Sequence, residues 1–196
     1  MITSIDQLDL TKQYTYADYL TWQFSDRVEL IKGKIFKMSP APLRLHQRIA
    51  GTVFSKIDGY LENKMCEAYI APFDVRLVNK RKSTPDNQIV SVVQPDISVI
   101  CDKSKLDDRG CVGAPDWIVE ILSPGNTKKE MKDKFDLYQE NGVKEYWIIF
   151  PEYLQVQVFD LVNDKFTLRA IYANDEQIPV KVFDGFSIDS KAIFKL

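Results

Sequence analysis

Histidine is almost missing from this chain of 196 residues, which contains only His46. A single histidine excludes a zinc site built from several histidines, and a Ser-His-Asp triad would have to use it. Cysteine is also scarce, because Cys66, Cys101 and Cys111 are far apart and form no CxxC motif. Three scattered cysteines predict free thiols in a reducing cytoplasm.

Long apolar runs are missing as well. No apolar segment approaches the roughly 18 residues that a membrane-spanning helix needs, and the first residues do not have the pattern of a signal peptide. We therefore expect a cytoplasmic protein with no membrane partner. The formal net charge is only −2. This balance argues against tight non-specific binding of nucleic acid over the whole surface, but it allows a local basic groove.

The composition that is present suits one compact domain, with 45% hydrophobic, 12% aromatic and 28% charged residues. We predict a single domain over residues 1–196. It contains a helix and hairpin at 14–38, a core at 42–150 and a strand-rich tail at 151–196. Helical and extended patterns are mixed along the chain, which predicts the α/β class with a central mixed sheet flanked by helices.

A strand, a helix and a strand are predicted within residues 116–150, the length of a βαβ unit. Residues 117–122 are apolar on both faces except at Glu120, as in a strand at the middle of a covered sheet. The next helix has one face formed by positions i, i+3, i+4 and i+7: Met131, Lys134, Phe135 and Tyr138. Glu120 and Lys134 could form a structural ion pair, or the lysine could extend its ammonium group to water.

The N-terminal third contains two further patterns. Thr15 and Asp18 have the spacing of a capping box, which predicts a short helix after Thr15. Residues 27–38 alternate around a Lys-Gly pair, which predicts a hairpin. In its first strand Glu29 shares a face with apolar Ile31, although a glutamate facing water from an edge strand is the alternative.

A long helix is predicted at residues 43–63, where apolar residues recur every four positions. His46 lies in its first turn, where a lone histidine is typical of packing or capping as well as of a ligand site. Residues 79–87 form a polar, basic loop that is either a solvated hairpin tip or a phosphate contact. We predict strands within 66–78 and 89–100 and a loop at 102–115.

The tail has the pattern of three strands, at residues 155–159, 166–172 and 178–182, followed by a short helix or turn near 190–193. An Asn-Asp pair at 163–164 predicts the turn between the first two strands. These strands offer more sheet edge than a small domain usually exposes. We therefore expect a homodimer formed through the tail.

Four charged side chains occupy places that favour apolar residues: Asp96, Glu120, Lys134 and Glu29. Asp96 follows Pro95, which lacks an N–H and belongs at a strand start. Two carboxylates at the ends of neighbouring strands form an all-oxygen site that suits Mg²⁺ or Mn²⁺ and not zinc. A nearby ammonium group can orient water or stabilise charge on a phosphoryl oxygen. This set of residues is chemically suited to phosphodiester hydrolysis.

The same residues carry a resemblance to a known family. Pro95-Asp96 with Glu120 on the next strand resembles the PD-(D/E)xK nuclease motif, and the wider pattern resembles the Uma-two family of restriction-endonuclease-like proteins. Five blocks, spread over about residues 14–190, carry it: V-E-L-I-K-G-K-I at 28–35, Ser39-Pro40 with His46, Q-P-D-I-S-V-I at 94–100, W-I-V-E-I-L-S-P at 117–124 and K-F-D-L-Y-Q-E-N-G-V-K-E-Y-W-I-I at 134–149.

The resemblance implies a restriction-endonuclease-like fold and a metal-dependent endonuclease that hydrolyses DNA. Asp96 and Glu120 would bind Mg²⁺ or Mn²⁺, with a backbone carbonyl near Ile121 as a further ligand. The usual lysine of this superfamily, two residues after the acid, is absent because Leu122 occupies that place. Lys134 on the following helix is the matching position.

In this interpretation Lys134 would position or deprotonate the attacking water. Glu29 would contact the metal through water or hold Lys134, and His46 would line the site. Two other functions stay compatible with the sequence. The chain could be an inactive nuclease-fold binding module whose acids and lysine form a buried ion network. It could also be a Mg²⁺-dependent phosphohydrolase acting on nucleotides, which would need a closed pocket where a nuclease needs an open groove.

Overall fold

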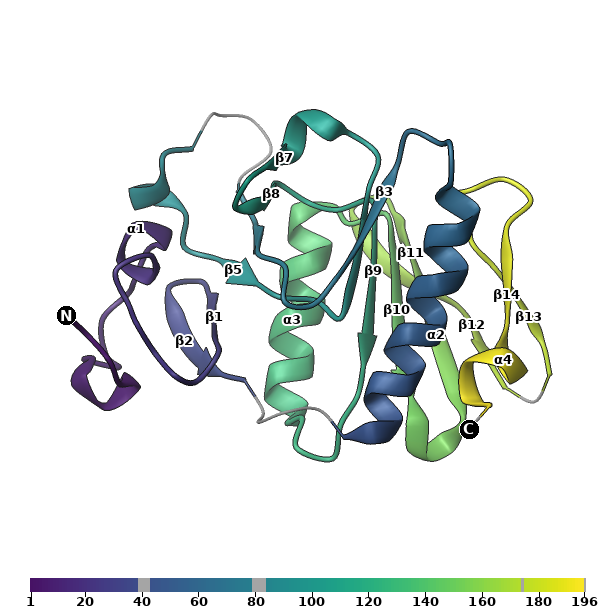
Figure 1. Ribbon diagram of the computed structural model, residues 1–196, viewed down its shortest axis with the longest axis horizontal. Helices are drawn as coiled ribbons and strands as arrows, with labels where there is room; N and C mark the ends of the chain where they lie inside the picture. Colours follow the sequence, from purple (N-terminus) through teal and green to yellow (C-terminus); the bar gives the residue numbers. More distant parts are fainter. Residues whose placement is uncertain (39–42, 79–83, 174, 196) are drawn as a thin grey trace.

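The computed structural model describes residues 1–38, 43–78, 84–173 and 175–195. The Ser39-Pro40 block and most of the basic loop at 79–87 lie outside the described residues. A central sheet is covered on one face by helix α2 (Arg44–Leu61) and on the other by helix α3 (Lys128–Asn141) (Figure 1). The mixed α/β architecture with a strand-rich C-terminal part is confirmed.

The central sheet has six strands in the order β12-β11-β10-β9-β6-β3. Its strands β9 and β10 run parallel, and the other neighbours are antiparallel, so the sheet is mixed as predicted. With α3 between them, β9 and β10 form the predicted βαβ unit. In chain order the strands are β3 (Glu67–Ile70), β6 (Ile97–Ile100), β9 (Trp117–Ile121), β10 (Glu145–Phe150), β11 (Gln155–Val162) and β12 (Lys165–Tyr172).

Alternation along β9 decides which way each side chain points. Trp117, Val119 and Ile121 belong to the hydrophobic cluster that includes α2, whereas Ile118 belongs to the cluster that includes α3. Glu120 therefore faces α3, because residues two apart on a strand share a face. This geometry brings the glutamate of the strand to the helix that carries the lysine.

Helix α3 begins and ends at residues suited to those places. The side chain of Thr127 accepts a hydrogen bond from the amide of Glu130, which caps the first turn. Gly142 ends the helix with φ of 83°, a left-handed conformation that glycine adopts without a side-chain clash. The helix is thereby fixed at both ends while its apolar face packs on the sheet.

A second sheet of six strands lies beside the first, in the order β2-β1-β5-β4-β8-β7. Strand β1 lies between β2 and β5, so the alternative of an edge-strand Glu29 facing water is wrong, and this side chain is only 2% exposed. The strands are β1 (Val28–Ile31), β2 (Lys34–Lys37), β4 (Val75–Arg76), β5 (Val92–Val93), β7 (Leu106–Asp107) and β8 (Gly110–Val112).

The predicted loop at 102–115 is wrong in part, because it contains the 3-10 helix η3 (Lys103–Lys105) and the antiparallel pair β7–β8. Strands of two or three residues are too short for their side chains to show a period. Gly110 is required there, because its φ is 122° and a Cβ atom would lie 2.2 Å from the carbonyl oxygen of Asp74.

Several other local predictions agree with the structure, but the strand predicted at residues 178–182 is wrong in part, because β13 ends at Pro179 and residues 181–182 form a turn. Helix α1 (Tyr16–Tyr19) is capped by Thr15 and Asp18, and the hairpin at 27–38 is formed by β1 and β2. The turn at 163–164 joins β11 to β12 with positive φ at both residues. The other elements are η1 (Ile5–Gln7), η2 (Asp86–Gln88), η4 (Pro151–Tyr153), β13 (Gln177–Pro179), β14 (Ser187–Asp189) and α4 (Ser190–Phe194).

The prediction of three free thiols is wrong, because Cys66 and Cys101 form a disulfide. Glu67 of β3 pairs with Ile100 of β6 in antiparallel register, so the next residues outward on the two strands stand opposite each other. A sequence does not show this register. Cys111 is free and buried, and burial raises the pKa of its thiol to about 12.

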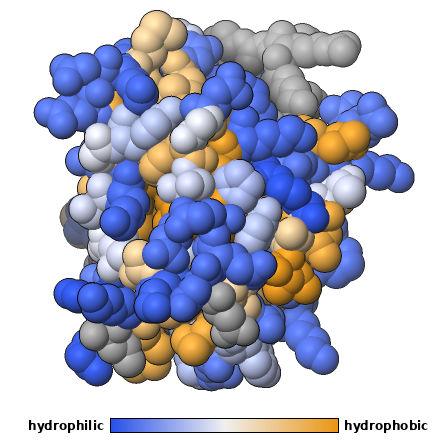
Figure 2. All heavy atoms as spheres, turned by 90° about the vertical axis from the view of Figure 1, so that its right-hand side faces the viewer, coloured by the Kyte–Doolittle hydropathy of each residue, from blue (hydrophilic) through white to orange (hydrophobic). Residues whose placement is uncertain are grey.

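The outer surface is mostly polar on the face that Figure 2 shows, where hydrophobic residues are interspersed among hydrophilic ones. This face is the right-hand side of the Figure 1 view. Among the described helices none is both long and apolar enough to cross a membrane.

Candidate active site

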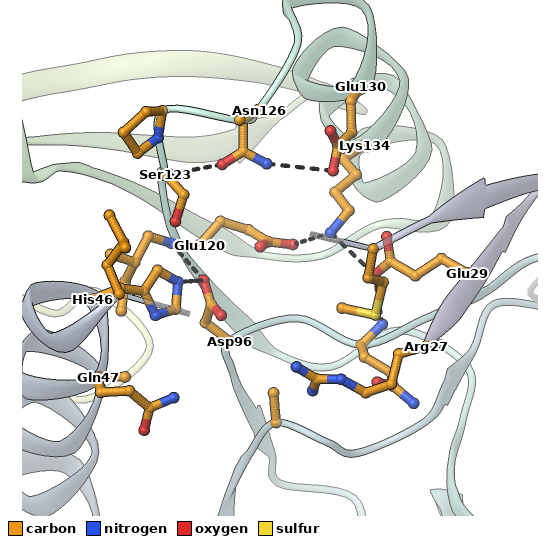
Figure 3. Close-up of a pocket in the computed structure, with 18 of the residues that line it drawn as sticks. Arg27, Glu29, His46, Gln47, Asp96, Glu120, Ser123, Asn126, Glu130 and Lys134 are labelled. Atoms are coloured by element: carbon orange, nitrogen blue, oxygen red, sulfur yellow. Dashed lines mark hydrogen bonds and ion pairs between the residues drawn. The ribbon is translucent and has the colours of Figure 1, made fainter. Parts of the chain in front are cut away.

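A cavity of about 340 Å³ lies where the first turn of α2, the strand β1 and the ends of β6 and β9 approach the start of α3. The six residues that the sequence singled out all line it: Glu29, His46, Asp96, Glu120, Ile121 and Lys134. Figure 3 shows the side chains of Glu29, His46, Asp96, Glu120 and Lys134 around one opening. The structure therefore brings together every predicted site residue.

Glu120 and Lys134 form the centre of this site. The Nζ atom of Lys134 lies 3.2 Å from Oε1 of Glu120. The hydroxyl group of Tyr138, one helical turn further along α3, donates to the same Oε1 atom over 2.6 Å. The two charged residues are only 9% and 8% exposed, so they lie at the base of the cavity.

Glu29 holds the lysine from the other side. Its Oε1 atom lies 3.0 Å from Nζ of Lys134 and accepts a hydrogen bond of 2.8 Å from the backbone N–H of Gln94. Glu29 was expected either to contact the metal through water or to hold Lys134, and the structure contains the contact with Lys134. A lysine between two carboxylates is a satisfied buried cation, and its amine does not reach outward to bulk water.

Burial and the neighbouring opposite charges act in opposite directions on the pKa values of Lys134 and Glu120. Burial lowers the pKa of Lys134, but the carboxylates of Glu120 and Glu29 outweigh it and hold the pKa well above its usual value. Burial raises the pKa of Glu120 to about 7, with Lys134 opposing this rise and Asp96 adding to it. Lys134 is thus a protonated donor, which can orient water or stabilise negative charge but cannot accept a proton.

Asp96 lies directly before the first residue of β6, and two donors contact its carboxylate. Its Oδ2 atom accepts a hydrogen bond of 2.7 Å from the N–H of Ile121 and lies 3.2 Å from Nε2 of His46. Burial lowers the pKa of His46, but the bond to Asp96 outweighs it, so the pKa is raised. His46 therefore does more than pack in the first turn of α2, because it contacts a predicted site carboxylate.

The carboxylates offer oxygen ligands of the kind that Mg²⁺ takes. Both contacts of Asp96 use Oδ2 and both side-chain contacts of Glu120 use Oε1, which leaves one oxygen of each group outside these bonds. No three His, Cys, Asp or Glu side chains within the described ranges are grouped to hold a metal ion. The donor set fits Mg²⁺ as two carboxylates completed by water, a common arrangement for this ion.

Two details differ from the expected metal site. Figure 3 shows Glu120 extending toward Lys134, whereas the carboxylate of Asp96 lies beside His46. At Ile121 the contact to Asp96 is made by the backbone N–H. The carbonyl near Ile121 stays a prediction as a metal ligand.

Comparison with known proteins identifies the family. The family model described as "Uma2: Putative restriction endonuclease" matches residues 16–191. This chain belongs to the Uma2 family.

Two known proteins resemble this Uma2 chain along most of their length. The "Uncharacterized protein slr1290" of Synechocystis sp. (strain ATCC 27184 / PCC 6803 / Kazusa) is 23% identical over 176 residues, which cover 88% of this chain and 87% of the relative. The crystal structure of a "putative nuclease belonging to DUF820" from Anabaena variabilis ATCC 29413 superposes with a TM-score of 0.71. That alignment has 21% identity and covers 92% of this chain and 97% of the other, so it shows a shared fold.

Several residues that line this Uma2 site or contact its side chains were not singled out from the sequence as site residues. Tyr138 was placed only on the apolar face of its helix, although its position four residues after Lys134 puts both side chains on one side of α3. In the turn from β9 to α3, Asn126 accepts from the N–H of Ser123 over 2.7 Å and donates to Glu130 over 3.3 Å. Arg27 lines the cavity as well. No periodicity marks Arg27, Ser123, Asn126 or Glu130, because their roles depend on turn geometry and on contacts between separate segments.

Proposed function

We propose that this Uma2 chain is a divalent-metal-dependent endonuclease that hydrolyses DNA phosphodiester bonds. The observation that carries this proposal is the position of the Lys134 ammonium group, within 3.2 Å of two carboxylates and beside a cavity that also contains Asp96. An ion pair that served stability alone would need no opening. Here the same charges line a space that a phosphate group can enter.

The metal would be held by Asp96 and Glu120 through the oxygens that their internal contacts leave out. When bound, Mg²⁺ or Mn²⁺ supplies Lewis-acid activation of water and neutralises charge that develops on the phosphoryl group. The fit of two carboxylates to such an ion supports this assignment.

The protein side chains have separate tasks in this proposal. Lys134 donates hydrogen bonds to the attacking water or to a phosphoryl oxygen, and its raised pKa keeps it in the donor form. Glu29 keeps the ammonium group in place from the opposite side. His46 and the N–H of Ile121 fix the carboxylate of Asp96.

Incubation with plasmid and single-stranded DNA in Mg²⁺, Mn²⁺ or EDTA tests the activity. We expect metal-dependent cleavage that is lost in Asp96→Asn, Glu120→Gln and Lys134→Met. Lys132→Met is the matched control, because Lys132 lies on the same helix in an exposed ion pair with Asp136. This variant should cleave as the wild type does.

Calorimetric titration with Mn²⁺ separates the alternatives. Metal binding that disappears in Asp96→Asn and in Glu120→Gln supports the proposed site. Metal binding with hydrolysis of nucleoside triphosphates and no cleavage of DNA would favour a nucleotide phosphohydrolase. A wild-type chain that neither binds metal nor cleaves any of these substrates would be an inactive nuclease-fold binding module.

A further inference from the structure

Arg27 lies at the mouth of the cavity, and its position follows from the strand that it precedes. Arg27 and Glu29 are two residues apart, so their side chains project from the same face of the β1 segment. Glu29 is 2% exposed at the base, whereas Arg27 is exposed. The carbonyl oxygen of Arg27 accepts a hydrogen bond of 3.0 Å from the N–H of Met38, which anchors this residue to the hairpin.

The guanidinium group of Arg27 is available to a ligand. Its acidic neighbour Asp26 pairs with Lys37 over 2.7 Å. The other basic side chains that line the cavity, Lys134 and His46, contact carboxylates. Within the described part of the chain, Arg27 has no carboxylate at ion-pair distance. In Figure 3 it projects toward the open part of the cavity, across from Gln47 of α2.

The charge of the lining explains why a cation at the mouth matters. Four carboxylates line this cavity: Glu29, Asp96, Glu120 and Glu130. An approaching polyanion is repelled by them unless cations face it. A guanidinium group offers a planar fork of donors that matches two oxygens of one phosphate, and it keeps its charge at every physiological pH.

We propose that Arg27 binds a phosphate of the polynucleotide next to the phosphodiester that is hydrolysed at Glu120 and Lys134. This inference rests on the proposed function. It extends the site from the reacting groups to a contact with the neighbouring part of the bound nucleic-acid strand. The ligand class is a phosphodiester-linked polynucleotide, because a second phosphate is what distinguishes a strand from a single phosphate ester.

The chain provides a matched control for general charge. Arg48 lies on α2, one residue after Gln47, is exposed and does not line the cavity. Arg27→Ala and Arg48→Ala each remove one exposed guanidinium charge. Only the first removes a side chain that faces the proposed phosphate.

The experiment is fluorescence anisotropy with a labelled single-stranded oligonucleotide and the corresponding duplex, in Ca²⁺ in place of Mg²⁺, with a gel to show that the DNA stays intact. We expect Arg27→Ala to bind roughly tenfold more weakly than the wild type, as for a lost hydrogen bond to a charged group. The slope of log K against log salt should fall by about one. Arg27→Lys should lie between the two, and Arg48→Ala should stay within about twofold of the wild type.

The possible results distinguish a failure of the role proposed for Arg27 from a failure of the nuclease proposal. A wild type that binds and cleaves DNA, with Arg27→Ala binding equally well or losing no more than Arg48→Ala, would overturn the role of Arg27 and leave the nuclease proposal standing. A wild type that neither binds nor cleaves DNA would overturn the proposed function, and the role of Arg27 with it.

Discussion

The hydroxyl group of Tyr138 donates a hydrogen bond to Oε1 of Glu120 over 2.6 Å from a fully buried ring. Lys134, one turn earlier on α3, donates to the same oxygen. Two donors on one oxygen fix the orientation of the carboxylate and leave Oε2 outside these bonds. Tyr138 is thus a positioning residue for the predicted metal ligand.

Replacing Tyr138 by phenylalanine should shift the pH dependence of metal binding. Burial raises the pKa of Glu120 to about 7, and the bond from Tyr138 opposes this rise. Without the bond the pKa rises further, so the carboxylate needed for a metal forms only at higher pH. We expect the midpoint of Mn²⁺ binding, followed by calorimetry between about pH 6 and pH 8, to move upward in Tyr138→Phe.

Tyr146→Phe is the control for this shift. The Tyr146 ring lies 5.2 Å from the Tyr138 ring and is 2% exposed, but neither side-chain hydrogen bond of Glu120 comes from it. Equal pH shifts in the two variants would mean that ring packing, and not the hydrogen bond, governs Glu120.

The contribution of Lys134 to folding stability can be measured separately from its contribution to DNA cleavage. Lys134→Met leaves Glu29 and Glu120 buried without their cation, which should lower the free energy of unfolding by about 3–5 kcal/mol. Adding Glu29→Gln removes one of these charges and should recover part of the loss in urea denaturation. Cleavage should stay absent in the double variant. Recovered cleavage would show that Lys134 acts only as a structural cation.

Local periodicity explains why the sequence predicted Glu120 and Lys134. The two-residue period of the strand and the 3.6-residue period of the helix turn both side chains inward, and the βαβ unit brings the two elements together. Local periodicity alone does not predict the burial of Glu29, because this burial depends on β5, from a distant segment, pairing with β1. The same holds for Cys66 and Cys101, whose meeting depends on the register of β3 against β6. Contacts between distant segments leave no period in the sequence.

Counting thiols tests the disulfide between Cys66 and Cys101. Of the three cysteines, only Cys111 is free, so denatured chain without reductant should show one reactive thiol, and three after reduction. Native chain near about pH 8 should show none, because burial raises the pKa of Cys111 to about 12 and the thiolate is the reactive form. Three thiols in unreduced, denatured chain would contradict the disulfide.

The expected homodimer stays a proposal that the tail makes testable. Strand β12 forms one edge of the central sheet, and its Leu168 and Ile171 are 46% and 49% exposed. We propose that two copies associate through this edge, since an exposed strand edge favours pairing. Sedimentation at micromolar concentration should give the mass of a dimer, and Ile171→Lys should shift it toward a monomer. A monomeric wild type would refute the proposal.

Arg169 should anchor the C-terminal part to the central sheet. Its Nη2 atom lies 3.1 Å from Oε1 of Glu145, which is fully buried, and the guanidinium group also contacts Asp160. Arg169→Met leaves Glu145 as an uncompensated buried charge. We expect a loss of about 3 kcal/mol in the free energy of unfolding near neutral pH, measured by urea denaturation.

The pH dependence of that loss identifies its cause. Burial raises the pKa of Glu145, with Arg169 opposing the rise, so the Arg169→Met variant should have a higher pKa still. Such a carboxyl group is neutral in acid and charged at neutral pH, so the deficit should be small at acidic pH and grow as pH rises. Lys181→Met is the control, because Lys181 contacts Asp160 over 3.3 Å but is 65% exposed, and it should cost less than about 1 kcal/mol. A deficit in Arg169→Met that did not change with pH would indicate lost packing and not an unpaired Glu145.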